Sequence, residues 1–378
     1  MRASVFISSI IFLLHGCASE LSPLPKTESE RLNKLIATGH SSYVKFHNTP
    51  FDTLYAQQDH ILGDSRVDSL RFSARLGRIA GLVKVGDSLY VADGKQNCIW
   101  VIDGQGRVCR QVGSQGRGPG EFGKLSGLIR SDNFIFTTDI LNARVQKFNL
   151  NFRLQDSFNR VIYGTSLKGS QKITATDSLL YLSAGLHNAV ENLITVHQSV
   201  SPFDSLTSFL PRLIPKGMQP GAYNGYSIDT NRKGNIAVTY TGLSYIFVYD
   251  SSHQLQHVVY VNFPKEELPE NSPIEPVDKQ ANTASEAIGV KGLIGKPYLS
   301  NNGSLYFSRG GKLYYLRYFP DKNRYRPEWI KFFTYADPEI RKDKPDGIAI
   351  SNFVIDEDSS NIYFGSLFEE DIYRFSLD

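Results

Sequence analysis

Residues that could hold a metal ion are few and scattered in this chain. Of its eight histidines, His253 and His257 are four residues apart, but their surroundings indicate strand and turn, so they need not share a face. No HExxH-like or CxxC-like spacing is present, and no set of Asp, Asn and His residues points to one ion. We therefore predict no metal and no other cofactor.

Nucleophilic chemistry has no clear signature either, because a GxSxG stretch is absent. Asp93, Asp103 and Asp139 each follow a short apolar run, where a carboxylate accepts hydrogen bonds from the amides of a turn. We interpret them as turn formers and assign no catalytic residue. The glycine-rich stretch 113–120 lacks the Lys and the following helix of a phosphate-binding loop, so we interpret it as a close crossing between structural units.

Cys98 and Cys109 lie on consecutive predicted strands around the turn 103–106. A two-residue turn would place the two thiols opposite each other, and a four-residue turn would make them diagonal neighbours on one face. A periplasmic setting permits a disulfide between them. Two free thiols are the alternative.

The elements that position these residues recur along the chain. A short apolar strand recurs around Tyr90, with further copies at residues 136, 181, 237, 306 and 363, each preceded by a polar turn and followed by a second strand. Six copies at a period near fifty residues indicate a radial repeat, and four short strands per copy favour a propeller. We predict an all-β fold, a six-bladed β-propeller with four-stranded antiparallel blades. The 20 Tyr and 23 Phe suit wedge-shaped spaces between blades.

The N-terminus reads as an export signal. Arg2 is followed by the apolar run 5–14 and then by Gly16-Cys17, an order similar to the bacterial lipoprotein signal in which the Cys is acylated. The run is too short to span a bilayer permanently. We therefore expect residues 1–17 to be a signal peptide, Cys17 to carry lipid, and the membrane to be engaged through this anchor only. The outer membrane, on its periplasmic side rather than at the surface, is the expected location.

Domain boundaries follow from the repeat. Residues 18–65 are expected to be a loosely attached tether and N-terminal extension, and residues 66–378 the propeller domain. The sixth repeat runs out of chain after three strands, so an earlier strand must close the ring. We predict that residues 66–76 pair beside residues 372–377. The stretch 264–291 is expected to be a loop insertion.

A ligand site is expected at one mouth of the ring, where loops converge. We choose the mouth formed by the inter-blade loops and by the turns between second and third strands. Its basic and aromatic residues suit an acidic or sugar-like ligand. The candidate ligand-binding residues are Arg78, Arg117, Arg144, His187, Tyr223, Lys296 and Arg309.

The chain resembles a known family at Gly116-Arg-Gly-Pro-Gly-Glu-Phe122, which looks like the inter-blade loop of NHL-type propellers. As a whole it is similar to lipid-anchored six-bladed propeller proteins of Gram-negative bacteria, and this resemblance implies a fold and a tendency to bind. Three functions remain open: a non-catalytic binding or scaffold lipoprotein with a protein or glycan partner, a metal-dependent lactonase- or lyase-type enzyme, and a subunit of an envelope complex. The first is preferred, as a monomer. The net charge of +3 argues against an extended nucleic-acid groove.

Overall fold

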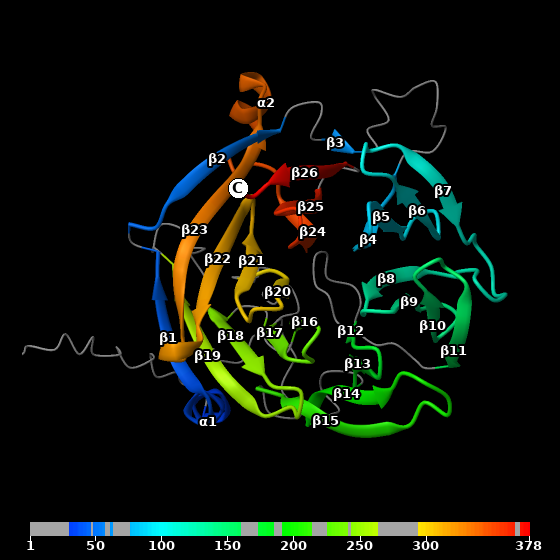
Figure 1. The fold of residues 1–378 in the computed structure, drawn as a ribbon, viewed down its shortest axis with the longest axis horizontal. Coiled ribbons are helices and arrows are strands. Elements are labelled where there is room, and N and C mark those ends of the chain that lie inside the picture. The colour runs from blue at the N-terminus through cyan, green and yellow to red at the C-terminus, as the bar shows by residue number, and fades with distance from the viewer. Residues whose placement is uncertain are drawn as a thin grey trace, which may run out of the picture.

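Six sheets stand around a common axis in the computed structural model of the chain (Figure 1). The structure describes residues 30–46, 48–56, 61–62, 76–159, 173–184, 191–213, 225–240, 243–263, 294–366 and 371–378. Each sheet contains four consecutive antiparallel strands, except that the sixth takes its outermost strand from the N-terminal part of the chain. The predicted six-bladed propeller is therefore confirmed.

Blades one to three follow one another along the chain. Blade one has the strands β4 (Ile79–Val85), β5 (Ser88–Asp93), β6 (Cys98–Ile102) and β7 (Val108–Val112). Blade two has β8 (Leu125–Arg130), β9 (Phe134–Asp139), β10 (Arg144–Asn149) and β11 (Leu154–Asn159). Blade three has β12 (Thr174–Ala175), β13 (Leu179–Ser183), β14 (Asn192–Gln198) and β15 (Ser205–Pro211).

Blades four to six complete the ring. Blade four has β16 (Tyr226–Thr230), β17 (Ile236–Tyr240), β18 (Tyr245–Tyr249) and β19 (Leu255–Asn262). Blade five has β20 (Pro297–Leu299), β21 (Leu305–Arg309), β22 (Lys312–Phe319) and β23 (Arg324–Tyr335), with the 3-10 turn η5 (Pro320–Lys322) between the last two. After helix α2 (Pro338–Asp343), blade six has β24 (Ile350–Asp356), β25 (Asn361–Ser366) and β26 (Ile372–Ser376).

The hydrophobic core is divided among the interfaces between blades. Each of the six neighbouring pairs of blades encloses its own cluster of buried side chains among the described residues. Successive side chains on a strand point to opposite faces of its sheet, so the middle strands are buried on both faces. In β6 all five residues are buried. Aromatic pairs such as Phe364 and Tyr373, whose ring centroids lie 5.4 Å apart, fill the wedge between sheets.

The ring is closed by an N-terminal strand, as expected, but by different residues. Strand β3 (Ile61–Leu62) pairs antiparallel with β26, through Ile372↔Leu62 and Tyr373↔Ile61. Of the segment 66–76 that the sequence favoured for this role, residues 66–75 lie outside the described residues, and Leu76 is described but lies in no strand. The predicted insertion 264–291 lies outside them as well.

The segment before the ring differs from the expected loose extension. Strand β1 (His40–Lys45) pairs parallel with β19 of blade four, and β2 (Phe51–Ala56) pairs parallel with β23 of blade five. Together β1, β2 and β3, which we call the N-terminal belt, edge blades four, five and six in turn (Figure 1). Helix α1 (Glu30–Thr38) precedes the belt and buries Leu32 in the cluster between blades three and four.

No helix within the described residues is both long and apolar enough to cross a membrane.

Candidate functional site

The structure places five of the seven predicted ligand-binding residues. His187 and Tyr223 lie outside the described residues, as does Cys17. Arg78 and Arg117 are exposed, and the guanidinium of Arg309 lies over the ring of Phe263, 4.2 Å from its centroid.

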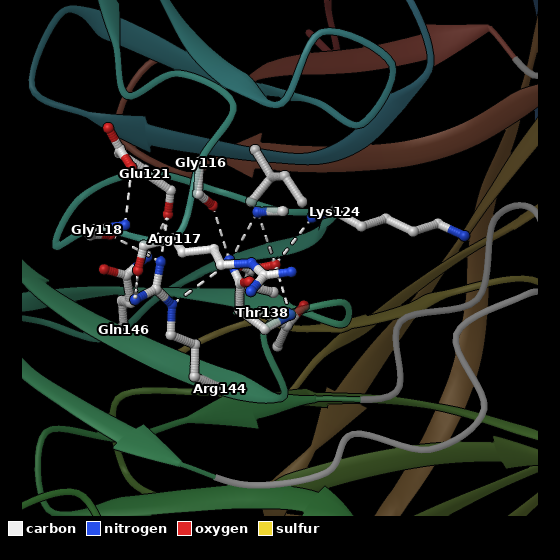
Figure 2. Close-up of polar contacts among 12 residues, drawn as sticks. Gly116, Arg117, Gly118, Glu121, Lys124, Thr138, Arg144 and Gln146 are labelled. Atoms are coloured by element: carbon white, nitrogen blue, oxygen red, sulfur yellow. Dashed lines mark hydrogen bonds and ion pairs between the residues drawn. The ribbon is translucent and has the colours of Figure 1, made fainter.

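Arg144 holds the inter-blade loop instead of facing a ligand (Figure 2). Its side chain is buried, and its guanidinium donates to the carbonyl oxygens of Arg117 (2.9 Å), Gly118 (2.9 Å) and Glu121 (2.8 Å). Its Nε also lies 3.4 Å from Oδ2 of Asp139. Its expected role in ligand binding is therefore not supported by the geometry, because both terminal nitrogens of the guanidinium donate to loop carbonyls inside the fold.

The same network confirms two structural interpretations. In the glycine-rich loop the amide of Gly118 donates to the Glu121 carboxylate (2.7 Å), and the amide of Gly120 donates to the Gln146 side chain (2.9 Å), so the loop is a close crossing onto blade two (Figure 2). Asp139 accepts from the amides of Gly123 (3.0 Å) and Lys124 (2.9 Å). Those two amides belong to the inter-blade loop, whereas the turn contact of Asp139 is a hydrogen bond from the amide of Asn142 at 3.4 Å. Asp93 and Asp103 are turn formers in the same way, because their carboxylates accept hydrogen bonds from amides of the turns that follow them.

A cavity of about 400 Å³ lies on the axis, at the other mouth from the one the sequence favoured. Its wall is made by the ends of the innermost strands and by the turns that lead from them to the second strands. Five of the seven predicted ligand-binding residues are described, and of these five Lys296 lines the cavity. The Lys, Arg, Asp and Glu residues that line it are Lys84, Arg130, Asp132, Asp177, Asp229, Arg232, Lys296, Asp356, Glu357 and Asp358.

Polar contacts at this mouth join blades five, six and one. The Tyr298 hydroxyl donates to Oε1 of Glu357 (2.9 Å), and the amide of Asn301 donates to the same oxygen (3.2 Å). Lys84 of blade one forms an ion pair of 3.5 Å with Asp356 of blade six. The turns of these three blades therefore form a continuous rim around the cavity.

The rim continues through blades two, three and four. Arg130 donates to the carbonyl oxygen of Lys84, and the amide of Asn133 donates to Asp177 of blade three (2.9 Å). Arg232 of blade four forms an ion pair of 3.0 Å with Asp132 of blade two, across the turn of blade three. Because every contact joins different blades, the polar rim also fixes the shape of the cavity.

The most strongly perturbed acid lines the cavity wall. Burial raises the pKa of Asp229 to about 6, although the nearby ammonium of Lys296 and the amide of Leu299, which donates to Oδ2 at 3.0 Å, act to lower it. Burial lowers the pKa of Lys296, and the charge of Asp229 opposes this shift. The Lys296 ammonium donates to the carbonyl oxygen of Phe353 at 3.1 Å. The two groups thus place opposite charges beneath the rim.

Sequence reasoning missed most of the cavity wall for an identifiable reason. The sequence pattern identifies the turns 131–133 and 176–178, which contain Asp132 and Asp177, only as tight reversals between strands, and it places the turns of blades four and six just after Arg232 and Glu357. A usable signal was present, because these turns carry charged residues in several copies of the repeat. All such turns of a propeller point to one mouth.

Of the two alternatives for the cysteines, the structure shows free thiols and no disulfide: Cys98 is a buried free thiol and Cys109 an exposed one. The register Ile99↔Val112 and Val101↔Arg110 places the two cysteines at opposite ends of the pair β6–β7. The reversal takes the longer path 103–107 and is followed by a bulge, so neither of the two expected turn lengths applies. Burial raises the pKa of the Cys98 thiol to about 12.

Among the residues with described positions, no group of three or more His, Cys, Asp or Glu side chains is arranged to hold a metal ion.

The fold and the axial site define a six-bladed β-propeller with a polar central cavity. The family model described as 6-bladed beta-propeller, DUF5128, matches residues 73–337, which is more than half of the chain. The chain therefore belongs to this 6-bladed beta-propeller family. None of the curated proteins compared with it matches.

Solved structures with a similar arrangement are remote in sequence. A Bacteroides fragilis protein described as exported is 15% identical, with 84% of this chain and 87% of that chain covered and a TM-score of 0.47. Virginiamycin B lyase from Staphylococcus aureus, in a catalytically inactive form with quinupristin, is 10% identical, with 81% and 83% covered and a TM-score of 0.44.

Proposed function

We propose that this chain is a non-catalytic binding protein of the cell envelope that takes a glycan at the axial cavity. The observation that carries the proposal is the cavity itself. Its volume of about 400 Å³ falls in the range of small-ligand pockets, and its rim combines carboxylate, amide, hydroxyl and guanidinium groups. Such a wall suits a ligand with many hydroxyl groups.

The charges of the cavity suit the binding of a polar ligand. Lys84 is paired with Asp356, Arg232 with Asp132, and Glu357 accepts two hydrogen bonds from blade five. These interactions give a fixed polar surface, and a preorganised surface lowers the cost of ordering side chains around a ligand.

The envelope location rests on the order Arg2, apolar run, Gly16, Cys17 and on the resemblance to lipid-anchored propellers of Gram-negative bacteria. An acylated terminus with two or three chains holds a protein stably to a bilayer. Fractionation of the Cys17→Ser variant tests this part separately. Release of the variant into the soluble fraction is expected, and retention in the membrane fraction would refute lipidation.

Calorimetric titration with mono- and disaccharides tests the site. We expect Arg130→Ala to weaken binding about tenfold, because Arg130 lines the cavity, whereas Arg78→Ala at the opposite mouth should leave it unchanged. If Arg78→Ala weakened saccharide binding and Arg130→Ala did not, the ligand would bind at the mouth formed by the inter-blade loops. Turnover of a lactone that is lost on chelation would instead favour the metal-dependent enzyme.

A further inference from the structure

Arg130 lines the axial cavity without a carboxylate partner, unlike Lys84 and Arg232 at the same mouth. Lys84 pairs with Asp356 at 3.5 Å, and Arg232 pairs with Asp132 at 3.0 Å. Arg130 forms no ion pair with any residue that the structure describes, and its one hydrogen bond to such a residue runs from Nη1 to the carbonyl oxygen of Lys84. Its Nε and Nη2 keep accessible surface, so both can donate to a ligand in the cavity.

The charges around Arg130 leave one positive charge unbalanced. Burial lowers the pKa of Arg130, and the neighbouring charge of Arg232 lowers it further, whereas the carboxylates of Asp132 and Asp356 act to raise it. With Lys84 this makes three cations and two carboxylates on this side of the cavity. An anion with a single negative charge would therefore balance this part of the wall.

The wall across the axis from Arg130 offers carboxylates instead. Arg130 is the last residue of β8 in blade two, which stands opposite blade five in the ring (Figure 1). Glu357 and Asp358, in the turn of blade six beside blade five, line the cavity and are exposed.

The Glu357 carboxylate is only partly used by the fold. Its Oε1 accepts from Tyr298 (2.9 Å) and Asn301 (3.2 Å), but its Oε2 accepts only a longer contact of 3.4 Å from the amide of Asn301. A carboxylate oxygen accepts about two hydrogen bonds, so Oε2 can receive a further donor. This side of the cavity is therefore suited to the hydroxyl groups of a ligand.

We infer that the ligand is a glycuronate, a sugar that carries a carboxylate, and that this carboxylate binds Nε and Nη2 of Arg130 while ring hydroxyls donate to Glu357 and Asp358. This inference rests on the proposed function and deepens it by naming the class of sugar. The two N–H groups on one edge of a guanidinium match the two oxygens of a carboxylate. A sugar phosphate fits less well, because its second negative charge would be repelled by the carboxylates across the axis.

Calorimetric titration with matched sugars tests the inference. The pairs are glucuronate with glucose, galacturonate with galactose and mannuronate with mannose, because the members of each pair differ only at C6. At least one uronate should bind about tenfold or more tightly than its parent hexose, and acetate, a carboxylate without a sugar ring, should bind more weakly than that uronate. Equal affinities within every pair would overturn the inference and leave the axial saccharide site, whereas no binding by any sugar would overturn both. Acetate that bound as tightly as the uronates would also overturn the inference.

Substitution of Arg130 shows whether its charge is the cause of the preference. Arg130→Gln removes the charge but keeps an amide that can donate to the carbonyl oxygen of Lys84, so the ratio of uronate to hexose affinity should fall to about one. An unchanged urea midpoint shows that this variant folds. Arg78→Ala, which changes an exposed arginine at the opposite mouth, is the matched control and should keep the ratio. A ratio that survived in Arg130→Gln, or that disappeared in Arg78→Ala, would contradict the assignment.

Discussion

Oδ1 of Asp132 and Nε of Arg232 lie 3.0 Å apart and thereby join blade two to blade four across blade three. Both side chains are largely exposed, with 47% and 62% of their side-chain areas accessible. An exposed pair of this kind contributes about 0–1 kcal/mol to stability. The consequence of the pair is therefore local order at the mouth rather than stability of the ring.

We expect Arg232→Ala to leave the free energy of unfolding within about 1 kcal/mol of the wild type and to speed amide exchange in the turn 131–133. High salt should likewise speed amide exchange in the turn 131–133 of the wild-type protein, because salt screens the attraction between exposed charges. Hydrogen exchange measured by mass spectrometry checks both. Arg107→Ala, which breaks the exposed pair with Asp103 inside blade one, is the control and should not affect residues 131–133.

Among the described charged residues, Arg144 should be one of those whose substitution lowers the free energy of unfolding most. Its replacement by Ala removes three hydrogen bonds to loop carbonyls and the ion pair with the buried Asp139. We expect a loss of about 3–5 kcal/mol in the free energy of unfolding, measured with urea. The exposed Arg117 of the same loop is the control, and its change to Ala should cost no more than about 0.5 kcal/mol. Equal stability of the two variants would contradict the structural role.

Asp229 gives stability a defined pH dependence. Burial raises the pKa of Asp229 to about 6 in the folded protein, whereas the ordinary value of 3.8 applies to the unfolded chain. Between pH 4 and pH 6 the folded state therefore binds more protons than the unfolded state. Stability should therefore fall as pH rises through this window, by an amount on the order of 3 kcal/mol. Thermal unfolding across this range should show that fall in the wild type and a smaller one in Asp229→Asn. Parallel profiles would show that Asp229 titrates normally.

The N-terminal belt should be integral to the ring. Val44 on β1 is fully buried in the cluster between blades four and five, and its neighbour Lys45 is exposed. Val44→Asp should cost about 3 kcal/mol or more, because it buries an unpaired charge, whereas Lys45→Asp should be nearly neutral. Urea unfolding measures both. If β1 were only loosely attached, the two variants would unfold at the same urea concentration.

Local patterns explain which features the sequence could predict. Alternating apolar residues and polar turns identify strands such as β5 and β9, because both signals act over a few residues. Strand β1, with the sequence HSSYVK, carries weak alternation, and β3 is only two residues long, so neither stands out. Their positions depend on partners far along the chain.

Local sequence patterns predict the candidate site less well than they predict the strands. Exposed surface is the default expectation for an Arg. The burial of Arg144 depends on the carbonyls that the loop 113–123 turns toward it, which sequence spacing does not reveal. The choice between the two mouths likewise depends on how the inner strands approach the axis. Lys296 was found because it follows an inter-blade loop, although the side chain reaches the wall of the cavity at the other mouth.

The N-terminal belt has a consequence for how the chain folds. It is synthesised before the six blades, yet His40 pairs with His257, more than 200 residues later, and Ile61 pairs with Tyr373 near the other end of the chain. Contacts at such sequence separation form slowly, and until they form the outer strands of blades four, five and six are open edges that favour association between chains. Ring closure therefore waits for the last strand to be made, and refolding at high protein concentration should compete with aggregation.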